Sequence, residues 1–287
     1  MLLLLDLERI DEDLFRGASR SALVPRVFGG QVAAQALVAA GRTVPADRPP
    51  HSLHAYFLRT GDPAAPIVYT VDRIRDGRSF TTRRVVAVQH GRPIFHLTAS
   101  FQLFEEGLDH QDAMPAAPDP DTLPTAAESL PRYRDAFRDP GVVERLLEAR
   151  GAVDLRYAST PPWGSVDRPT EARSLVWFRT ASKLARDDAL THACLIAYVS
   201  DMTLLDPVLL AHGRGGWAVG DVVGASLDHA MWFHRPARAD EWLLYEQESP
   251  TASGGRGLGQ AHIWTHDGRL AVTVVQEGVI RVPRARA

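Results

Sequence analysis

Asp201 stands where the sequence pattern expects an apolar residue. The helical stripe of Leu190, Cys194 and Ala197 continues to position 201 at the same spacing, so the carboxylate falls in line with the buried face. It also falls at the C-terminal end of that helix, where burial and the negative end of the helix dipole both oppose a charge. A protein usually tolerates such a carboxylate only when it has partners and a function. The alternative is that Asp201 simply ends the helix at the surface.

Gln276 is the second polar residue in an apolar row. The last strand of the chain alternates, and every second residue from Leu270 to Ile280 shares one face with Gln276. A buried amide in that row needs hydrogen-bond partners. The alternative is an ordinary glutamine near the end of a strand. The corresponding position in the first half of the chain is close to Ser100, so the two halves differ here.

Other candidates for chemistry are weaker when taken alone. Ser226 begins a predicted strand over 226–233, where an ordinary hydroxyl is the simplest interpretation. Asp228 and His229 suggest a base, yet adjacent strand residues point to opposite faces and cannot form one dyad. His54 is a further candidate base, although a structural histidine is the favoured interpretation.

The elements that must position these residues occur twice in the chain. Each half has a helix of small residues, a strand, a glycine-containing turn, a long strand, a Gly-Arg turn and a last strand. Four landmarks, namely the first strand, the two turns and the last strand, follow in the same order in both halves and indicate a repeat. The paired strands, first turns and second turns are 52–59 and 226–235, 76–80 and 254–257, and 90–92 and 266–269.

The repeat predicts an α+β fold in which each unit wraps an antiparallel sheet around one helix. Alanine-rich stripes allow a curved sheet to approach a helix closely. We expect a first unit over residues 1–105 and a second over 171–287. Between them, residues 106–170 begin rich in Pro, Ala and Asp, which predicts a surface linker with its own helical segment.

Composition narrows the class of protein. The chain has 287 residues and a net charge of −3, so a nucleic-acid partner is not expected. The single cysteine, Cys194, excludes an intrachain disulfide, fits a reducing, cytoplasmic compartment, and is interpreted as a small buried residue. The apolar run at residues 2–5 is too short for a membrane span. Zinc-ligand spacing, phosphate loops, dinucleotide motifs and a Gly-x-Ser-x-Gly elbow do not occur in the sequence.

Four stretches of the sequence together resemble the acyl-CoA thioesterase II family. They are residues 27–32, 51–59, 227–235 and 275–278. The resemblance implies a double hotdog, two hotdog units whose sheets join edge to edge, and hydrolysis of acyl-CoA to free acid and CoA without a metal or another cofactor. It places the catalytic trio of the family on Asp201, Ser226 and Gln276. Many members carry Thr where this chain has Ser226, but the hydroxyl is retained.

The trio implied by the resemblance suggests a water-based mechanism. Asp201 would act as general base on a water that Ser226 and Gln276 hold, so no acyl-enzyme would form. The oxyanion would be stabilised by backbone N–H groups, for which a helix N-terminus is a candidate. Trp232 and Phe233 could line an acyl channel or only belong to the core.

Binding of CoA phosphates and self-association are the expected interactions. Arg78 and Arg256, in matching turns, are candidates for the phosphates, although surface arginines are often only solvated. The strand over 226–233 is apolar on both faces, which predicts a homodimer or a larger homo-oligomer. Two other functions stay open from the sequence: a hotdog hydratase or dehydratase, and a non-catalytic acyl-CoA-binding protein.

Overall fold

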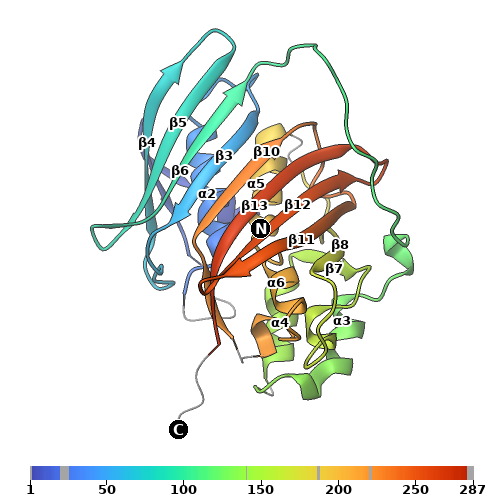
Figure 1. Cartoon of the computed structure of the whole chain (residues 1–287). Coiled ribbons are helices and arrows are strands. Elements are labelled where there is room, and N and C mark those ends of the chain that lie inside the picture. The colour runs from blue at the N-terminus through green and yellow to red at the C-terminus, as the bar shows by residue number, and fades with distance from the viewer. Residues whose placement is uncertain (1, 20–25, 140, 186–187, 220–221, 283–287) are drawn as a thin grey trace. The chain divides into compact units, whose positions relative to one another are not determined.

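The computed structural model describes residues 2–19, 26–139, 141–185, 188–219 and 222–282. These residues pack as two units (Figure 1). Unit 1 comprises Met1–Asp112, Leu184–Met202 and Asp228–Ala239, and unit 2 comprises Ala113–Lys183, Thr203–Leu227 and Asp240–Ala287. The division by packing therefore differs from the order of the repeats, and the predicted limits at residues 105 and 170 stay predictions.

The sheet of unit 1 is antiparallel and has the order β1-β2-β4-β5-β6-β3-β10. Alternating burial along these strands follows from their alternating apolar residues, which face the helices. The strands are β1 (Glu8–Asp11), β2 (Leu14–Gly17), β3 (Pro50–Phe57), β4 (Ile67–Asp76), β5 (Phe80–Gln89), β6 (Arg92–Gln102) and β10 (Asp228–Phe233).

Two helices, α2 (Gly29–Gly41) and α5 (Ala189–Ser200), pack together in unit 1. A short helix, α1 (Leu2–Leu5), precedes them in the sequence. The first turn of α2 meets the last turn of α5, because a Cβ on Gly30 would strike the carbonyl oxygen of Tyr198. At the other end, a Cβ on Gly41 would lie 2.5 Å from Leu190. Glycines at both ends of the contact therefore allow the two helices to approach closely as an antiparallel pair.

The sheet of unit 2 has the order β13-β12-β11-β8-β7, and β9 also pairs with β13. A short helix, α6 (Asp206–Leu210), lies on one face of this sheet, where Val208 occupies the space beside Gly257. The strands are β7 (Val153–Tyr157), β8 (Arg173–Thr180), β9 (Val223–Ser226), β11 (Leu243–Ser253), β12 (Arg256–Thr265) and β13 (Leu270–Arg281).

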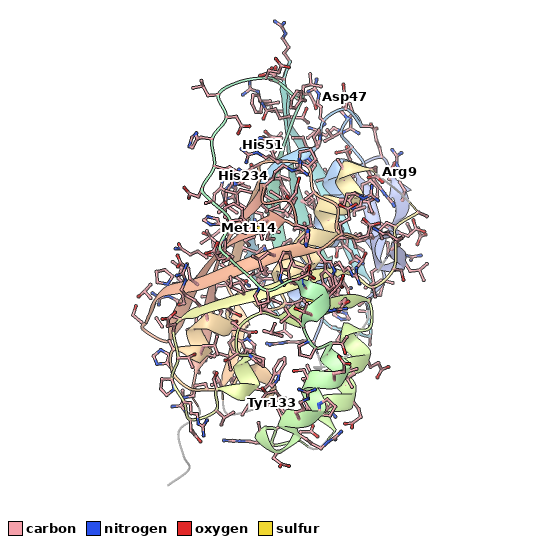
Figure 2. The ribbon with its side chains drawn as sticks, turned by 90° about the vertical axis from the view of Figure 1, so that its right-hand side faces the viewer. Arg9, Asp47, His51, Met114, Tyr133 and His234 are labelled. Carbon is pink, nitrogen blue, oxygen red and sulfur yellow. The ribbon has the colours of Figure 1, made fainter. Side chains whose placement is uncertain are left out.

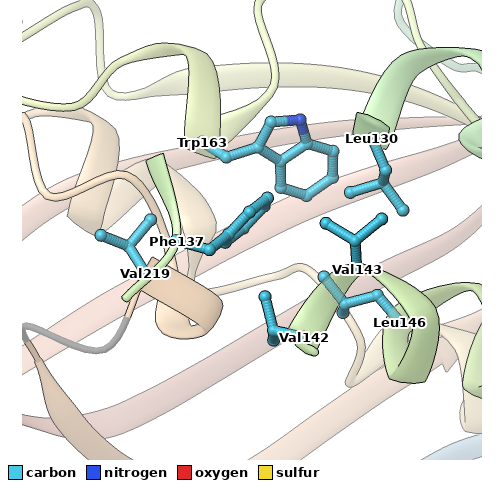
Figure 3. Packing of buried hydrophobic residues seen from close by; sticks show 7 residues of the cluster. All are labelled: Leu130, Phe137, Val142, Val143, Leu146, Trp163 and Val219. Carbon is cyan, nitrogen blue, oxygen red and sulfur yellow. The ribbon is translucent and has the colours of Figure 1, made fainter. Parts of the chain in front are cut away.

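The segment predicted as a linker has a buried core of its own in unit 2 (Figure 3). Its members are Leu130, Phe137, Val142, Val143, Leu146, Trp163 and Val219. The structure also adds β7, a strand that the sequence pattern did not predict. The helical elements of unit 2 before β9, apart from α6, are η1 (Pro120–Thr122), α3 (Ala126–Ser129), η2 (Leu130–Ala136, with Tyr133 labelled in Figure 2), α4 (Val142–Arg150), η3 (Pro162–Gly164) and η4 (Trp217–Val219).

Residues 114–123 cover a tryptophan cluster on the sheet of unit 2, formed by Trp177, Trp242, Leu244 and Trp264. The indole N–H of Trp177 donates to the carbonyl of Pro118 at 2.9 Å, and that of Trp242 donates to Asp121 at 3.3 Å. Met114, labelled in Figure 2, packs against the same cluster. The side of this sheet opposite α6 is therefore covered from within the unit.

The predicted α+β class, with antiparallel sheets packed against helices, is confirmed. The prediction of one continuous strand over residues 226–233 was wrong, because the strand is interrupted at Leu227. Ser226 is the last residue of β9 and pairs with β13, whereas β10 starts at Asp228 and pairs with β3. Among the helices of the described residues, none is both long and apolar enough to cross a membrane.

Candidate active site

Asp201 is the half-buried C-cap residue of α5. The end of the helix is closed just after it by the N–H of Met202, which donates to the carbonyl of Val199 at 2.9 Å. The Oδ2 atom of Asp201 lies 2.6 Å from the position that a Cβ would take on Gly29. Only a glycine at position 29 leaves room for the carboxylate in this position, so the first residue of α2 and the cap of α5 form one local arrangement in unit 1.

The electrostatics of Asp201 differ from what the sequence pattern predicts. The C-terminus of α5 disfavours a negative charge, as expected, but the carboxylate also lies at the N-terminus of α2, which favours one. The N-cap residue of α2, Phe28, provides no side-chain hydrogen bond to the first turn. The carboxylate therefore experiences a favourable field from α2, which the sequence alone did not reveal, besides the unfavourable field of α5.

The aromatic ring of Tyr198 lies close to the carboxylate of Asp201. Its ring packs edge-on against Phe28, with 5.1 Å between the ring centroids. Burial raises the pKa of Tyr198, and the negative charge of Asp201 raises it further. The phenol therefore stays neutral at physiological pH, and the surroundings of Asp201 are partly apolar.

A buried hydrogen bond connects the last residue of α5 to β10. Nε2 of His229 lies 2.8 Å from Oγ of Ser200, and the hydroxyl of Ser200 also lies 3.0 Å from the carbonyl oxygen of Ala197. His229 is 0% exposed. From the sequence, His229 was excluded only as a partner of Asp228, and its bond to Ser200 was not predicted. Its place in the same alternating row as buried Met231 was the available signal.

Ser226 and Gln276 lie on one face of the sheet in unit 2. Ser226 pairs with Gly278 on β13, and Gln276 is two residues earlier on the same strand, so the two side chains are diagonal neighbours. Gln276 is 1% exposed, which agrees with its predicted place in the buried row, and Ser226 is half-buried. The sheet therefore presents a hydroxyl and an amide side by side.

Two glycines on this face make room for the chain segment that follows Asp201. Gly259 is the register partner of Gln276, and a Cβ there would strike the carbonyl oxygen of Leu204. A Cβ on Gly278 would strike the side chain of Leu205. Residues 204–205 thus pack directly on the face that carries Gln276.

Thr203 anchors the start of that segment in unit 2. The amide Nε2 of Gln247 donates to its hydroxyl at 2.7 Å, and both side chains are buried. Thr203 follows Asp201 by two positions in the sequence. Gln247 was not identified from the sequence, because the pattern of β11 around it does not distinguish it from a glutamine at a surface.

His54, Trp232 and Phe233 do not share one site. His54 and Trp232 contact each other edge-on, with 5.2 Å between the ring centroids, on the face of the unit 1 sheet opposite the buried Leu53 and Ala55. Phe233 has the same strand parity as buried Met231, which lies on the helix side. Trp232 and Phe233 therefore point to opposite faces and cannot both line one acyl channel. His54 lies on the wrong face to act with Asp201.

Arg78 lies in the predicted turn, whereas Arg256 is the first residue of β12, and both are exposed. Arg48 organises the turn of Arg78 by donating to the carbonyls of Gly77, at 2.8 Å, and of Arg78, at 3.0 Å. This turn borders a cleft of about 480 Å³ in unit 1, which is lined by four arginines, Arg42, Arg48, Arg73 and Arg83.

Arg256 forms an ion pair with Glu277 at 2.8 Å, on the face of its sheet opposite Gln276. A phosphate would have to compete with that carboxylate.

Cys194 is buried in α5, and burial raises the pKa of its thiol well above the usual range. It therefore behaves as the small buried residue that the sequence indicates. In the described part of the chain, no three His, Cys, Asp or Glu side chains are grouped so that they could hold a metal ion.

Comparisons with known proteins agree on one family. The model of the acyl-CoA thioesterase N-terminal domain matches residues 19–102, and that of the C-terminal domain matches residues 112–280. Human acyl-coenzyme A thioesterase 8 is 43% identical over 97% of this chain and 88% of its own length. The chain belongs to the acyl-CoA thioesterase II family.

Two bacterial relatives extend this result. Acyl-CoA thioesterase 2 of Haemophilus influenzae is 41% identical over 97% of this chain and 96% of its own length. The crystal structure of acyl-CoA thioesterase II TesB2 from Mycobacterium marinum is 44% identical, covers 98% of both chains and has a TM-score of 0.79. The predicted family and double-hotdog fold are confirmed, and this acyl-CoA thioesterase is a thioester hydrolase, as expected.

Proposed function

We propose that this thioesterase hydrolyses acyl-CoA with Asp201 as general base and with Ser226 and Gln276 orienting the attacking water. The observation that supports this most is the carboxylate of Asp201 at the N-terminus of α2, in the space that Gly29 leaves. In unit 2, the adjacent hydroxyl and amide of Ser226 and Gln276 form a pair able to hold one water molecule.

The reaction would proceed in two steps without an acyl-enzyme. Water attacks the thioester carbonyl carbon while its proton passes to the carboxylate of Asp201, giving a tetrahedral oxyanion. The oxyanion then collapses and the C–S bond breaks. Asp201 returns the proton to the CoA sulfur, so the products are a carboxylic acid and free CoA. The first N–H groups of α2 are suitable donors for the oxyanion, because they are oriented toward the carboxylate end of the site.

Two further parts of the proposal concern binding and assembly. Arg78, in a turn held by Arg48, and Arg256 are proposed to contact the phosphates of CoA. The functional protein is proposed to be a homodimer, and a cytoplasmic location stays a prediction from the single cysteine.

The substitution Asp201→Asn tests the proposed base. We expect the variant to fold normally and to lose about 10²- to 10⁴-fold in kcat, the usual contribution of a positioned acid–base group. The assay is release of CoA thiol from acyl-CoA substrates of increasing chain length. The matched control is Asp188→Asn at the other end of the same helix, where Asp188 caps the N–H of Thr191 and asparagine caps equally well. Near-normal turnover by Asp201→Asn would refute the assignment of the base.

Mass spectrometry of the denatured enzyme during turnover tests the non-covalent mechanism. We expect no acyl adduct on Ser226. An adduct trapped there would replace the water mechanism with nucleophilic catalysis by the serine.

A further inference from the structure

A buried polar side chain holds the end of α5 that carries Asp201. Ser200 immediately precedes Asp201, and its Oγ lies 2.8 Å from Nε2 of His229 on β10. Both residues are 0% exposed. A buried imidazole is costly unless it is hydrogen-bonded, and Val, Ile or Leu would suit this strand position better on packing grounds alone. The site therefore retains a polar residue where packing does not need one.

The hydrogen-bonding pattern determines the direction of this bond. Ser200 has a single hydroxyl proton, and the carbonyl oxygen of Ala197 lies 3.0 Å away and is the stronger acceptor, compared with the sulfur of Met231 at 3.6 Å. Oγ of Ser200 therefore accepts a hydrogen bond from the Nε2–H of His229. The chain His229–Ser200–Ala197 links the strand to the last turn of the helix.

We propose that His229 is a positioning residue, which fixes the carboxylate of Asp201 by holding Ser200 at the end of α5. This inference rests on the proposed role of Asp201 as general base. The carboxylate has little freedom where it lies, because it occupies the space left by Gly29. A small rotation of the last turn of α5 would move it away from the N-terminus of α2. Displacements of about 1 Å in a catalytic group can cost about 100-fold in rate.

The first test compares two substitutions of His229. His229→Leu removes the donor at similar size, and we expect kcat to fall about 10- to 100-fold with little change in KM. His229→Gln restores an N–H donor at a similar reach, and we expect most of the lost kcat to return.

Ser200→Ala should reproduce the effect of His229→Leu, and the double variant should be no worse than either single variant. The matched control is Ile67→Leu, a volume-conserving change at an equally buried site on β4 of the same sheet, with kcat near that of the wild type.

A second cycle separates positioning from a merely structural role. In the Asp201→Asn background, His229→Leu should cause no further loss of the residual rate, because the carboxylate that it positions is already absent. A folded His229→Leu variant with the wild-type kcat, or losses that multiply in the Asp201→Asn background, would overturn the inference. If instead Asp201→Asn itself retains full activity, the proposed function fails, and that result is distinct from failure of the role of His229.

Discussion

At the scale of single residues, Asp201 lies between two helix ends of opposite sign. The C-terminus of α5 opposes its charge and the N-terminus of α2 favours it, and each effect is typically worth about 0.3–1 kcal/mol. Neither effect dominates by magnitude, so the position of the carboxylate relative to the two ends determines which one acts on it more strongly. That position depends on Gly29.

Gly29→Ala is therefore predicted to impair catalysis more than folding. The added methyl group would lie 2.6 Å from Oδ2 of Asp201 and 2.8 Å from Cε1 of Phe57, so the carboxylate must shift. We expect kcat to fall about 10- to 100-fold, whereas stability should change little, since alanine in a helix is favoured over glycine. Steady-state kinetics and thermal denaturation measure the two effects. Gly107→Ala, with no atom within 4 Å of the added methyl group, is the control. Unchanged kcat in Gly29→Ala would show that the carboxylate tolerates displacement.

The candidate residues were only partly predictable from the sequence. Asp201 and Gln276 stand out because a polar residue interrupts an apolar period, and that signal is local. His229 was missed because its partner, Ser200, is far away in the sequence and lies on another element. The electrostatic field at Asp201 was predicted incompletely for the same reason, because the second helix end comes from the other repeat.

At the scale of elements, the two helices of unit 1 depend on glycines at their crossing. Gly29 and Gly30 are neighbours, yet a methyl group on each would meet different atoms. At Gly29 the obstacles are side chains, which can move. At Gly30 one obstacle is the carbonyl oxygen of Tyr198, which belongs to the backbone of α5 and can move only with the helix.

Gly30→Ala is accordingly predicted to destabilise the fold. The helices must separate to admit the methyl group, and overpacking of this kind typically costs about 1–3 kcal/mol. Chemical denaturation of Gly30→Ala and Gly29→Ala in parallel gives the comparison. A free energy of unfolding for Gly30→Ala equal to that of Gly29→Ala would indicate that α5 adjusts freely, which would contradict the close crossing.

The elements themselves were predicted better than their pairing. Both helices and the last strand of each repeat are where the sequence pattern places them, whereas β4 and β11 were not predicted. The interruption at Leu227 was not predictable, because alternation continues across it while the hydrogen-bonding partner changes from β13 to β3. β7 is short and follows α4, so its pairing with β8 left no distinct pattern.

At the scale of the whole molecule, the two units differ in whether the outer face of each sheet is covered. In unit 2, residues 114–123 cover the tryptophan cluster. In unit 1, the face of β3 opposite the helices carries Tyr56, which is 54% exposed, and His54, which is exposed. Exposed aromatic side chains grouped on one sheet face are typical of an interaction surface.

The last prediction is that a second copy of this chain covers the exposed face of unit 1. Closed homodimers are the most common way in which such a surface is buried. Light scattering at micromolar concentration should give twice the chain mass of 31.5 kDa. Tyr56→Lys places a charge on that face at a side chain that is already 54% exposed, so the fold is retained while the dimer dissociates. Leu3→Lys, at a side chain that is 75% exposed on α1, on the helix side of the sheet, is the control and should stay dimeric. A wild-type protein that is fully active as a single chain would show that the face needs no partner, and a Tyr56→Lys dimer would place the contact elsewhere.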